Sequence, residues 1–208
     1  MRVLHIITHL IRGGAQENTV LTAAHHRRWG LDVTIATGSR WRVDPALEDL
    51  CREAQVPLLS VSALERNPRP ARDLVALAQL LRLLRTTSFD VVHTHTSKAG
   101  FLGRLAAAAT GAPAVIHTSH GHIFDAYYGP MRTAGYVVLE RFAAGLSRRL
   151  VALTPREVHD HLSLGIGTAA QFRVVPSGVA LERFAPAGQG RRREARSRLG
   201  LTDDDFVI

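Results

Sequence analysis

Residues 90–122 read DVVHTHTSKAGFLGRLAAAATGAPAVIHTSHGH and contain two short apolar runs with a helix-like segment between them. The runs, Val91–Val92 and Ala114–Ile116, have the composition of strands that are buried on both faces of a sheet. The segment between them, 101–109, is rich in alanine and leucine, which favour a helix. A strand, a helix and a second strand in this order predict a βαβ unit and therefore a parallel sheet.

The same alternation runs along the rest of the chain. We expect strands at 3–8, 32–37, 56–61, 90–94, 114–118, 149–153 and 173–175. We expect helices at 15–29, 45–54, 72–85, 101–109, 132–144 and 192–199, with another that begins at Thr154-Pro155. Repeated βα units of this kind predict an α/β fold with a doubly wound, mostly parallel sheet. One helix carries a leucine stripe that we expect to face the core: Leu74, Leu77, Leu80, Leu81 and Leu84.

The composition of the chain limits which binding partners and which cellular location we expect for the protein. The net charge of +8 would suit nucleic acid, an anionic membrane or a phosphate-bearing substrate. The arginines are spread along the chain and no nucleic-acid-binding motif is visible, so we expect no nucleic-acid partner. The single cysteine, Cys51, forms no internal disulfide, and a cytoplasmic location is the default. The longest nearly uncharged run, 105–118, is too short to span a bilayer.

A change of composition near the end of the chain predicts a domain boundary. Residues 185–190 are rich in proline, glycine and alanine, which is typical of a linker. A short helix and the start of a strand at 206–208 follow. We therefore assign 1–184 to one domain, and 185–208 to a linker and the first elements of a second domain.

Two histidine-rich loops follow the strands of the opening stretch. One contains His93 and His95, and the other runs from His117 to His122. In an open α/β sheet, ligands bind outside the carboxyl ends of the strands, where these loops would lie. Lys98, the only lysine of the chain, falls in the first loop.

These histidines have three interpretations. A metal site is the first, but the spacing after His122 places Phe124 where a metallohydrolase would carry aspartate, and no carboxylate cluster completes a shell. Burial in the core is the second, and we expect it for His93 and His117. For His120, in an exposed Ser-His-Gly setting, we favour the third, which is hydrogen bonding to a hydroxyl or proton transfer.

Two further segments have open interpretations. Gly13-Gly14 lies between the first strand and the first helix, where backbone N–H groups can meet a phosphate, although a tight turn without a ligand would also need glycine. The spacing matches neither the dinucleotide fingerprint nor a P-loop. Residues 123–131, IFDAYYGPM, either pack their aromatic rings beneath the loop or form a lip towards lipid or acceptor, with Arg132 beside it.

Five stretches together resemble the N-terminal half of a family 4 glycosyltransferase: Val3 to Gly14 followed by Ala15-Gln16-Glu17, DVVHTHTSKAGFLGRLAA, HTSHGH, Leu153-Thr154-Pro155 and VVPSGVALERFAP. The resemblance covers residues 1–186. It implies a retaining enzyme of the GT-B fold, in which two Rossmann-like domains enclose the active site. The N-terminal domain would hold the acceptor, and the C-terminal domain would hold the nucleotide-sugar.

The resemblance also implies roles for particular residues. His120 matches the active-site histidine, and Gly13 with Gly14 matches the loop that approaches the diphosphate and sugar of the donor. The other residues implied in donor or substrate binding are Gln16, His95, Ser97, Lys98 and Gly121.

The implied partners are a nucleotide-sugar and a sugar or lipid-linked acceptor, with no cofactor and no metal. The implied location is cytoplasmic, with peripheral contact to the inner face of the membrane. The Glu-x₇-Glu motif of the family belongs to the C-terminal domain, so we expect this chain alone to be inactive. Two alternatives stay open, a sugar-nucleotide 2-epimerase of similar shape and a non-enzymatic module that senses a nucleotide or sugar.

Overall fold

The computed structural model describes residues 1–39, 43–121, 129–179 and 188–206. A seven-stranded sheet has the order β3-β2-β1-β4-β5-β6-β7. The strands are β1 (Arg2–Ile7), β2 (Asp32–Thr37), β3 (Leu58–Ser60), β4 (Val91–His95), β5 (Val115–Thr118), β6 (Arg149–Ala152) and β7 (Phe172–Val174). Every neighbouring pair is parallel, which confirms the predicted fold.

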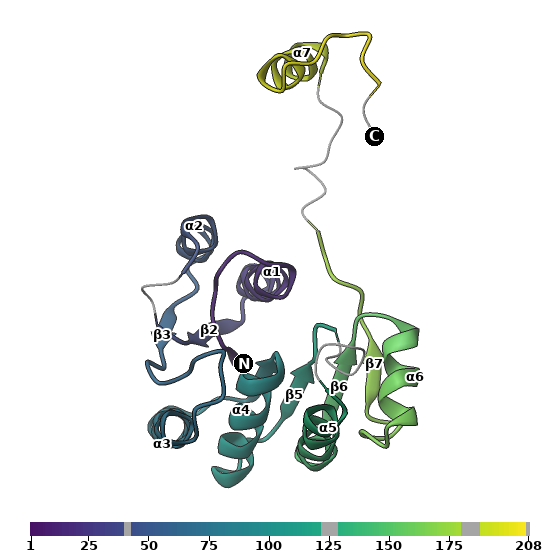
Figure 1. The fold of residues 1–208 in the computed structure, drawn as a ribbon. Helices are drawn as coiled ribbons and strands as arrows, with labels where there is room; N and C mark the ends of the chain where they lie inside the picture. Colours follow the sequence, from purple (N-terminus) through teal and green to yellow (C-terminus); the bar gives the residue numbers. More distant parts are fainter. Residues whose placement is uncertain (40–42, 122–128, 180–187, 207–208) are drawn as a thin grey trace. The chain divides into compact units, whose positions relative to one another are not determined.

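Helices cover both faces of this sheet. They are α1 (Gly14–Arg28), α2 (Pro45–Glu53), α3 (Pro70–Thr86), α4 (Ser97–Ala109), α5 (Pro130–Gly145) and α6 (Pro155–Ser163). A further helix, α7 (Gln189–Arg198), belongs to a separate compact unit, Val179–Ile208. α1 and α2 lie on one face, while α3, α4 and α5 lie on the other (Figure 1). α6 packs on β6 and β7 through Val158 and Leu162.

The order of the strands reverses its direction at β1. The neighbours of β1 are β2 on one side and β4 on the other, so the chain crosses over β1 between β3 and β4. The carboxyl ends of β1 and β4 therefore flank the topological switch point, which is where open α/β sheets bind ligands.

The side chains of β1 serve both faces because they alternate along the strand. Val3 and Ile7 pack in the core beneath α1 and α2. Leu4 and Ile6 pack in the core beneath α3 and α4. Because both faces of β1 are buried, the strand is a nearly continuous apolar run. His5, in the middle of this strand, is an exception to that pattern.

Side-chain caps and a glycine mark the ends of three helices. The side chain of Asp44 caps α2, and Thr154 caps α6 by accepting a hydrogen bond from the backbone N–H of Glu157. Gly30, two residues after the end of α1, has a φ of +80°, a conformation that glycine adopts without steric cost.

Two helical expectations need correction. α4 begins at Ser97, not at Phe101, so Lys98, which we expected in a loop, lies in the first turn of this helix. The leucine stripe of α3 is wrong at Leu74, which is 68% exposed. The fully buried positions are Ala76 and Leu80, and Leu74 precedes Ala76 by about 200° of helical rotation, so it faces solvent.

The chain divides into two compact units, Met1–Gly178 and Val179–Ile208. The predicted boundary after residue 184 lies outside the described residues and stays a prediction, as does the strand at 206–208. Among the described residues, no helix is long and apolar enough to cross a membrane.

Candidate functional site

The carboxyl ends of β1, β4 and β5 carry two residues in an uncommon backbone conformation. Thr96, directly after β4, has φ +61° and ψ +166°, and His120, after β5, has φ +58°. Neither is glycine, so the surrounding structure must hold both in place, and such strained residues gather at functional sites. The hydroxyl of Thr96 lies 3.0 Å from that of Thr8, which follows β1. This contact ties the two sides of the switch point together.

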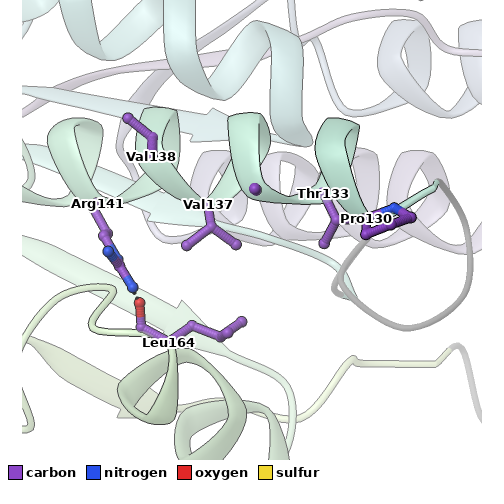
Figure 2. Close-up of a pocket in the computed structure, with 7 residues that line it drawn as sticks. Pro130, Thr133, Val137, Val138, Arg141 and Leu164 are labelled. Atoms are coloured by element: carbon purple, nitrogen blue, oxygen red, sulfur yellow. Dashed lines mark hydrogen bonds between the residues drawn. The ribbon is translucent and has the colours of Figure 1, made fainter.

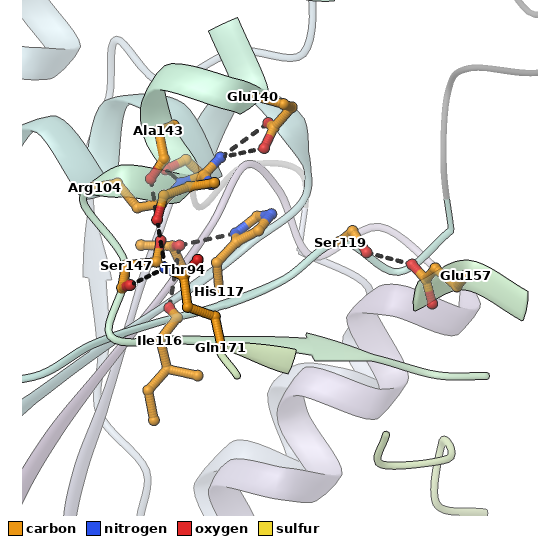
Figure 3. Close-up of polar contacts among 12 residues, drawn as sticks. Thr94, Arg104, Ile116, His117, Ser119, Glu140, Ala143, Ser147, Glu157 and Gln171 are labelled. Atoms are coloured by element: carbon orange, nitrogen blue, oxygen red, sulfur yellow. Dashed lines mark hydrogen bonds and ion pairs between the residues drawn. The ribbon is translucent and has the colours of Figure 1, made fainter. Parts of the chain in front are cut away.

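His120 is held from both sides. Its Nε2 lies 2.8 Å from Nδ1 of His95, one strand away. The carboxylate of Glu157 accepts hydrogen bonds from the hydroxyl of Ser119 and, at 3.3 Å, from the backbone N–H of Gly121 (Figure 3 shows the first of these). The residues before and after His120 are thus anchored to the first turn of α6.

Glu157 is a site residue that we did not predict. Its second oxygen accepts a hydrogen bond from the backbone N–H of Leu153 at 2.7 Å, and its own N–H donates to Thr154 Oγ1 at 3.1 Å. Thr154 and Glu157 have the spacing of a capping box, so the sequence signal for this buried carboxylate was present.

Burial depresses the pKa of His120 to about 4, while the nearby charge of Glu157 raises it in part. At neutral pH the imidazole is therefore uncharged, and it can donate one hydrogen bond and accept one. In this state the imidazole can hydrogen-bond to a hydroxyl or to an anionic oxygen, but it does not form an ion pair.

A second layer of histidines lies behind His120. His95 is only 1% exposed, so it supports His120 from beneath. Its Nε2 lies 2.9 Å from Nδ1 of His5 in β1, and the two rings stack with centroids 5.2 Å apart. Burial is the main reason that the pKa of both histidines falls well below 6.5. We did not predict His5; its signal was a histidine at the centre of an apolar strand.

His117 is a core histidine, as expected, whereas His93 is only partly buried. His93 Nε2 lies 2.8 Å from the hydroxyl of Thr118, and His117 Nδ1 lies 3.0 Å from that of Thr94. Burial is also the main cause that lowers the pKa of both, to about 3 for His93. Arg104, which adds to this effect at His117, is buried in α4, and its Nη2 donates to both carboxylate oxygens of Glu140 at 2.8 and 2.9 Å (Figure 3).

One histidine group has the spacing for a metal ion. His5, His93 and His95 each offer a ring nitrogen, and these atoms lie within 4.8 Å of one another. No carboxylate belongs to the group among the described residues. The nitrogens already form hydrogen bonds, His5 with His95 and His93 with Thr118. We therefore interpret the group as a hydrogen-bonded cluster, and metal-free action stays a prediction.

The glycine loop leads into α1 as predicted. Gly13 is the N-cap and offers no side-chain cap, so the first backbone N–H groups of the helix are open to an anion. A Cβ on Gly14 would meet nothing within 4 Å, whereas one on Gly13 would lie 2.6 Å from Gln16 Oε1. Gln16 is buried, and its amide nitrogen lies 3.1 Å from His9 Nδ1. The side chain of Gln16 therefore packs beneath the loop and contacts it.

The remaining predicted residues divide between the site and the scaffold. Gly121, at φ +99°, is exposed beside His120. Ser97 is partly exposed at the start of α4. Lys98 turns away, since its ammonium pairs with Asp73 of α3 and donates to the carbonyl of Asn67 at 2.5 Å. The structure thus brings His120, His95 and Gly121 together and ties Lys98 to the neighbouring helix.

A separate hollow of about 620 Å³ lies between α5 and the end of α6. Val137, Val138 and Arg141 of α5 line it together with Leu164 (Figure 2). It shares no residue with the histidine cluster. The predicted lip lies largely outside the described residues, which end at Gly121 and resume at Gly129.

Comparison with known proteins gives a consistent result. A family profile described as "Glycosyl transferase 4-like domain" matches residues 13–178. A UDP-Gal:alpha-D-GlcNAc-diphosphoundecaprenol alpha-1,3-galactosyltransferase from Escherichia coli is 37% identical over 78% of this chain and 40% of its own length.

Solved structures resemble the chain in fold. Sucrose-phosphate synthase from Thermosynechococcus elongatus has a TM-score of 0.74 and 16% identity, over 98% of this chain and 53% of that protein. UDP-GlcNAc 2-epimerase from Neisseria meningitidis has a TM-score of 0.68 and 16% identity, over 99% of this chain and 56% of that protein. The chain therefore spans about half the length of the proteins it matches.

Proposed function

The chain belongs to the glycosyl transferase 4-like family, and we propose that it is the N-terminal, acceptor-binding half of a retaining glycosyltransferase. The enzyme would move a hexosyl group from a nucleotide-sugar to a polysaccharide or glycolipid acceptor. The observation that carries this proposal is the placement of His120, which has a strained conformation after β5, beside the switch point, contacts His95, and lies between two residues that Glu157 binds.

The chemistry of the site fits transfer of a neutral sugar. A neutral imidazole at His120 can hydrogen-bond to a hydroxyl or ring oxygen without requiring a charged substrate. The open N-terminus of α1 offers backbone N–H groups and the positive end of a helix dipole, which favour a diphosphate. The helix N-terminus would stabilise the negative charge that develops on the diphosphate as its bond to the sugar breaks, while His120 would orient the sugar.

The name of the galactosyltransferase relative indicates which substrates to try first. That protein uses UDP-galactose and a GlcNAc-diphosphoundecaprenol acceptor. We propose that this protein likewise takes a nucleotide diphosphate hexose and an acceptor linked to a polyprenyl diphosphate. Most contacts to the donor would come from a C-terminal domain, and the proposed reaction needs no metal or cofactor.

The test is a donor and acceptor screen on the full-length protein. UDP-galactose, UDP-glucose and UDP-GlcNAc are each incubated with GlcNAc-diphosphoundecaprenol, with and without EDTA, and the products are read by mass spectrometry. We expect an acceptor-dependent gain of one hexose that EDTA does not abolish. Release of an epimerised sugar would support a 2-epimerase, and binding without turnover would support a sensor. Either result would overturn the transferase.

We also propose a cytoplasmic location with peripheral contact to the membrane. α5 exposes Val138, Leu139 and Phe142, and Met131 in its first turn is 88% exposed. Apolar side chains on a protein with net charge +8 suit an anionic lipid surface. We expect the full-length protein to co-sediment with vesicles of phosphatidylglycerol at low salt, and Phe142→Ser to weaken this. Equal recovery in the supernatant with and without vesicles would contradict it.

A further inference from the structure

Three histidines from three parts of the fold form a row in which neighbouring rings are linked by hydrogen bonds between their nitrogens. His5 of β1 meets His95 of β4 through Nδ1 and Nε2 at 2.9 Å. His95 meets His120, after β5, through Nδ1 and Nε2 at 2.8 Å. His95 therefore uses both of its ring nitrogens, and the row runs from the centre of the sheet to the candidate active site.

The protons of this row are coupled. Burial is the main cause that lowers the pKa of all three rings, so each is neutral near pH 7. A neutral imidazole carries one N–H donor and one acceptor nitrogen. If His95 donates through Nδ1, it must accept through Nε2, and the reverse also holds. Both hydrogen bonds must then point the same way along the row, either outwards to His120 or inwards to His5.

The surroundings of the two ends decide the direction. At the outer end, Glu157 binds Ser119 and Gly121, and its negative charge acts on His120. At the inner end, the groups that act on His5 are other histidines, His93 and His26, and burial lowers their pKa as well. A proton, with its positive partial charge, is stabilised at the end that faces the carboxylate.

The outer nitrogens give a second reason. His5 Nε2 and His120 Nδ1 are both buried without a hydrogen-bond partner among the described residues. An inward row would leave an N–H group on His5, which is 0% exposed. Buried N–H groups without an acceptor are rarer than incompletely paired acceptors. An outward row places the N–H group on Nδ1 of His120, which is itself buried but belongs to a residue that is partly exposed as a whole.

We propose that His5 and His95 are positioning residues that fix His120 as its Nδ1–H tautomer, so that His120 meets its ligand as a hydrogen-bond donor and not as a base. The ligand atom would be an acceptor oxygen, such as a sugar hydroxyl or ring oxygen. That part of the inference rests on the proposed glycosyltransferase function, whereas the proton order does not.

The proton order can be read directly by NMR. The chain is prepared with ¹⁵N-histidine, and long-range ¹H–¹⁵N correlations are recorded at pH 7, with assignments from single histidine variants. We expect protonated Nδ1 and unprotonated Nε2 in His5, His95 and His120. A protonated Nε2 in His120 would overturn the proposal. So would stoichiometric metal in the purified chain, because an ion would occupy the acceptor nitrogens.

Two variants of His5 test its influence on His120. His5→Leu removes the inner donor, so His95 can protonate Nε2 and the row can reverse; we expect the Nε2–H form of His120 to rise to at least half of the population. His5→Asn keeps an amide donor near the Nδ1 position, and we expect it to retain the Nδ1–H form. If His120 is unchanged in both variants, His5 does not set its tautomer.

The functional consequence is read separately in the full-length protein. We expect His5→Leu to lower kcat about tenfold with little change in KM, and His5→Asn to recover most of the loss. The predicted tautomers without any sugar transfer would leave the proton order standing and reject the function. Sugar transfer together with a protonated Nε2 in His120 would support the glycosyltransferase function and reject the proposed proton order.

Discussion

At the scale of single residues, His120 carries the main functional assignment. Its φ of +58° and its contacts to His95 show that the fold holds this side chain in place. We expect His120→Ala to lower kcat of the full-length enzyme by about 10²-fold, the size of effect seen when one preorganised donor is removed. Steady-state kinetics with a fixed acceptor measures this.

A matched control separates this loss from damage to the fold. His159 is an exposed histidine of α6, and His159→Ala should leave kcat and the unfolding temperature unchanged. An unaltered rate in His120→Ala would remove His120 from the reaction.

Lys98 was a candidate ligand contact, and its ion pair with Asp73 now makes a structural role the better prediction. If Lys98 joins α4 to α3, Lys98→Met and Asp73→Asn should lower the unfolding temperature by similar amounts and leave KM unchanged. A rise in KM in Lys98→Met alone would restore Lys98 to substrate binding. Calorimetry and acceptor titrations on both variants decide the matter.

The buried histidines make stability depend on pH. Burial holds the pKa of His93 at about 3, against 6.5 for an exposed histidine, and His5, His95 and His117 shift the same way. Below pH 6.5 the unfolded chain therefore binds protons that the folded chain excludes. Its free energy of unfolding should fall from pH 6.5 towards pH 3, by up to about 1.4 kcal/mol per pH unit for each such histidine.

The groups that face this cluster are themselves mostly histidines, with Arg104 beside His117 and Glu157 beside His120. Urea unfolding at pH 7.5, 6.5 and 5.5 measures the effect. Equal stability at pH 6.5 and 5.5 would show that the histidines are not buried in the neutral form.

At the scale of elements, the N-terminal end of α6 stabilises both the helix itself and the loop that carries His120. Thr154 caps the helix, while Glu157 also anchors the His120 loop. Thr154→Ala should therefore cost about 1 kcal/mol of stability and leave kcat unchanged. Glu157→Gln should lower both stability and kcat, because the loop loses a charged acceptor. If the two variants have the same kcat, Glu157 does not position the loop.

The elements show what periodicity can and cannot predict. Strands near 32–37 and 114–118 were predictable because they are short, β-branched and bounded by turns. The start of α4 was not, because Thr96 and Ser97 have no strong helical preference and the helix begins from a strained residue. Leu74 was misplaced because a leucine-rich helix has several possible stripes, and only packing selects the one through Ala76 and Leu80.

The candidate site was predictable to a similar degree. The position of His120 was predictable because it follows a strand that the sequence predicts, and its role stays a prediction. Its supports were not, since His5 and Glu157 lie far from it in sequence and meet it only through the sheet order β1-β4-β5-β6. The contact between His5 and His95 spans 90 residues, a separation that no local pattern encodes.

At the scale of the whole molecule, the described fold would form one side of the proposed sugar-transfer site. The first compact unit, Met1–Gly178, coincides closely with the matched family domain, 13–178. We expect the isolated chain to bind no nucleotide-sugar at micromolar concentration, because the donor contacts would lie in the other half. Calorimetric titration with UDP-galactose tests this, and micromolar binding would contradict the assignment of the domains.

The central claim is that the protein is a retaining glycosyltransferase whose acceptor half is this chain. The stereochemistry of the product tests it most directly. The full-length protein is supplied with an α-linked UDP-hexose and its lipid-linked acceptor, and the anomeric coupling constant of the new linkage is measured by ¹H NMR. The account predicts an α-linked product. A β-linkage would contradict the retaining assignment, and a failure to transfer any donor sugar would contradict the function itself.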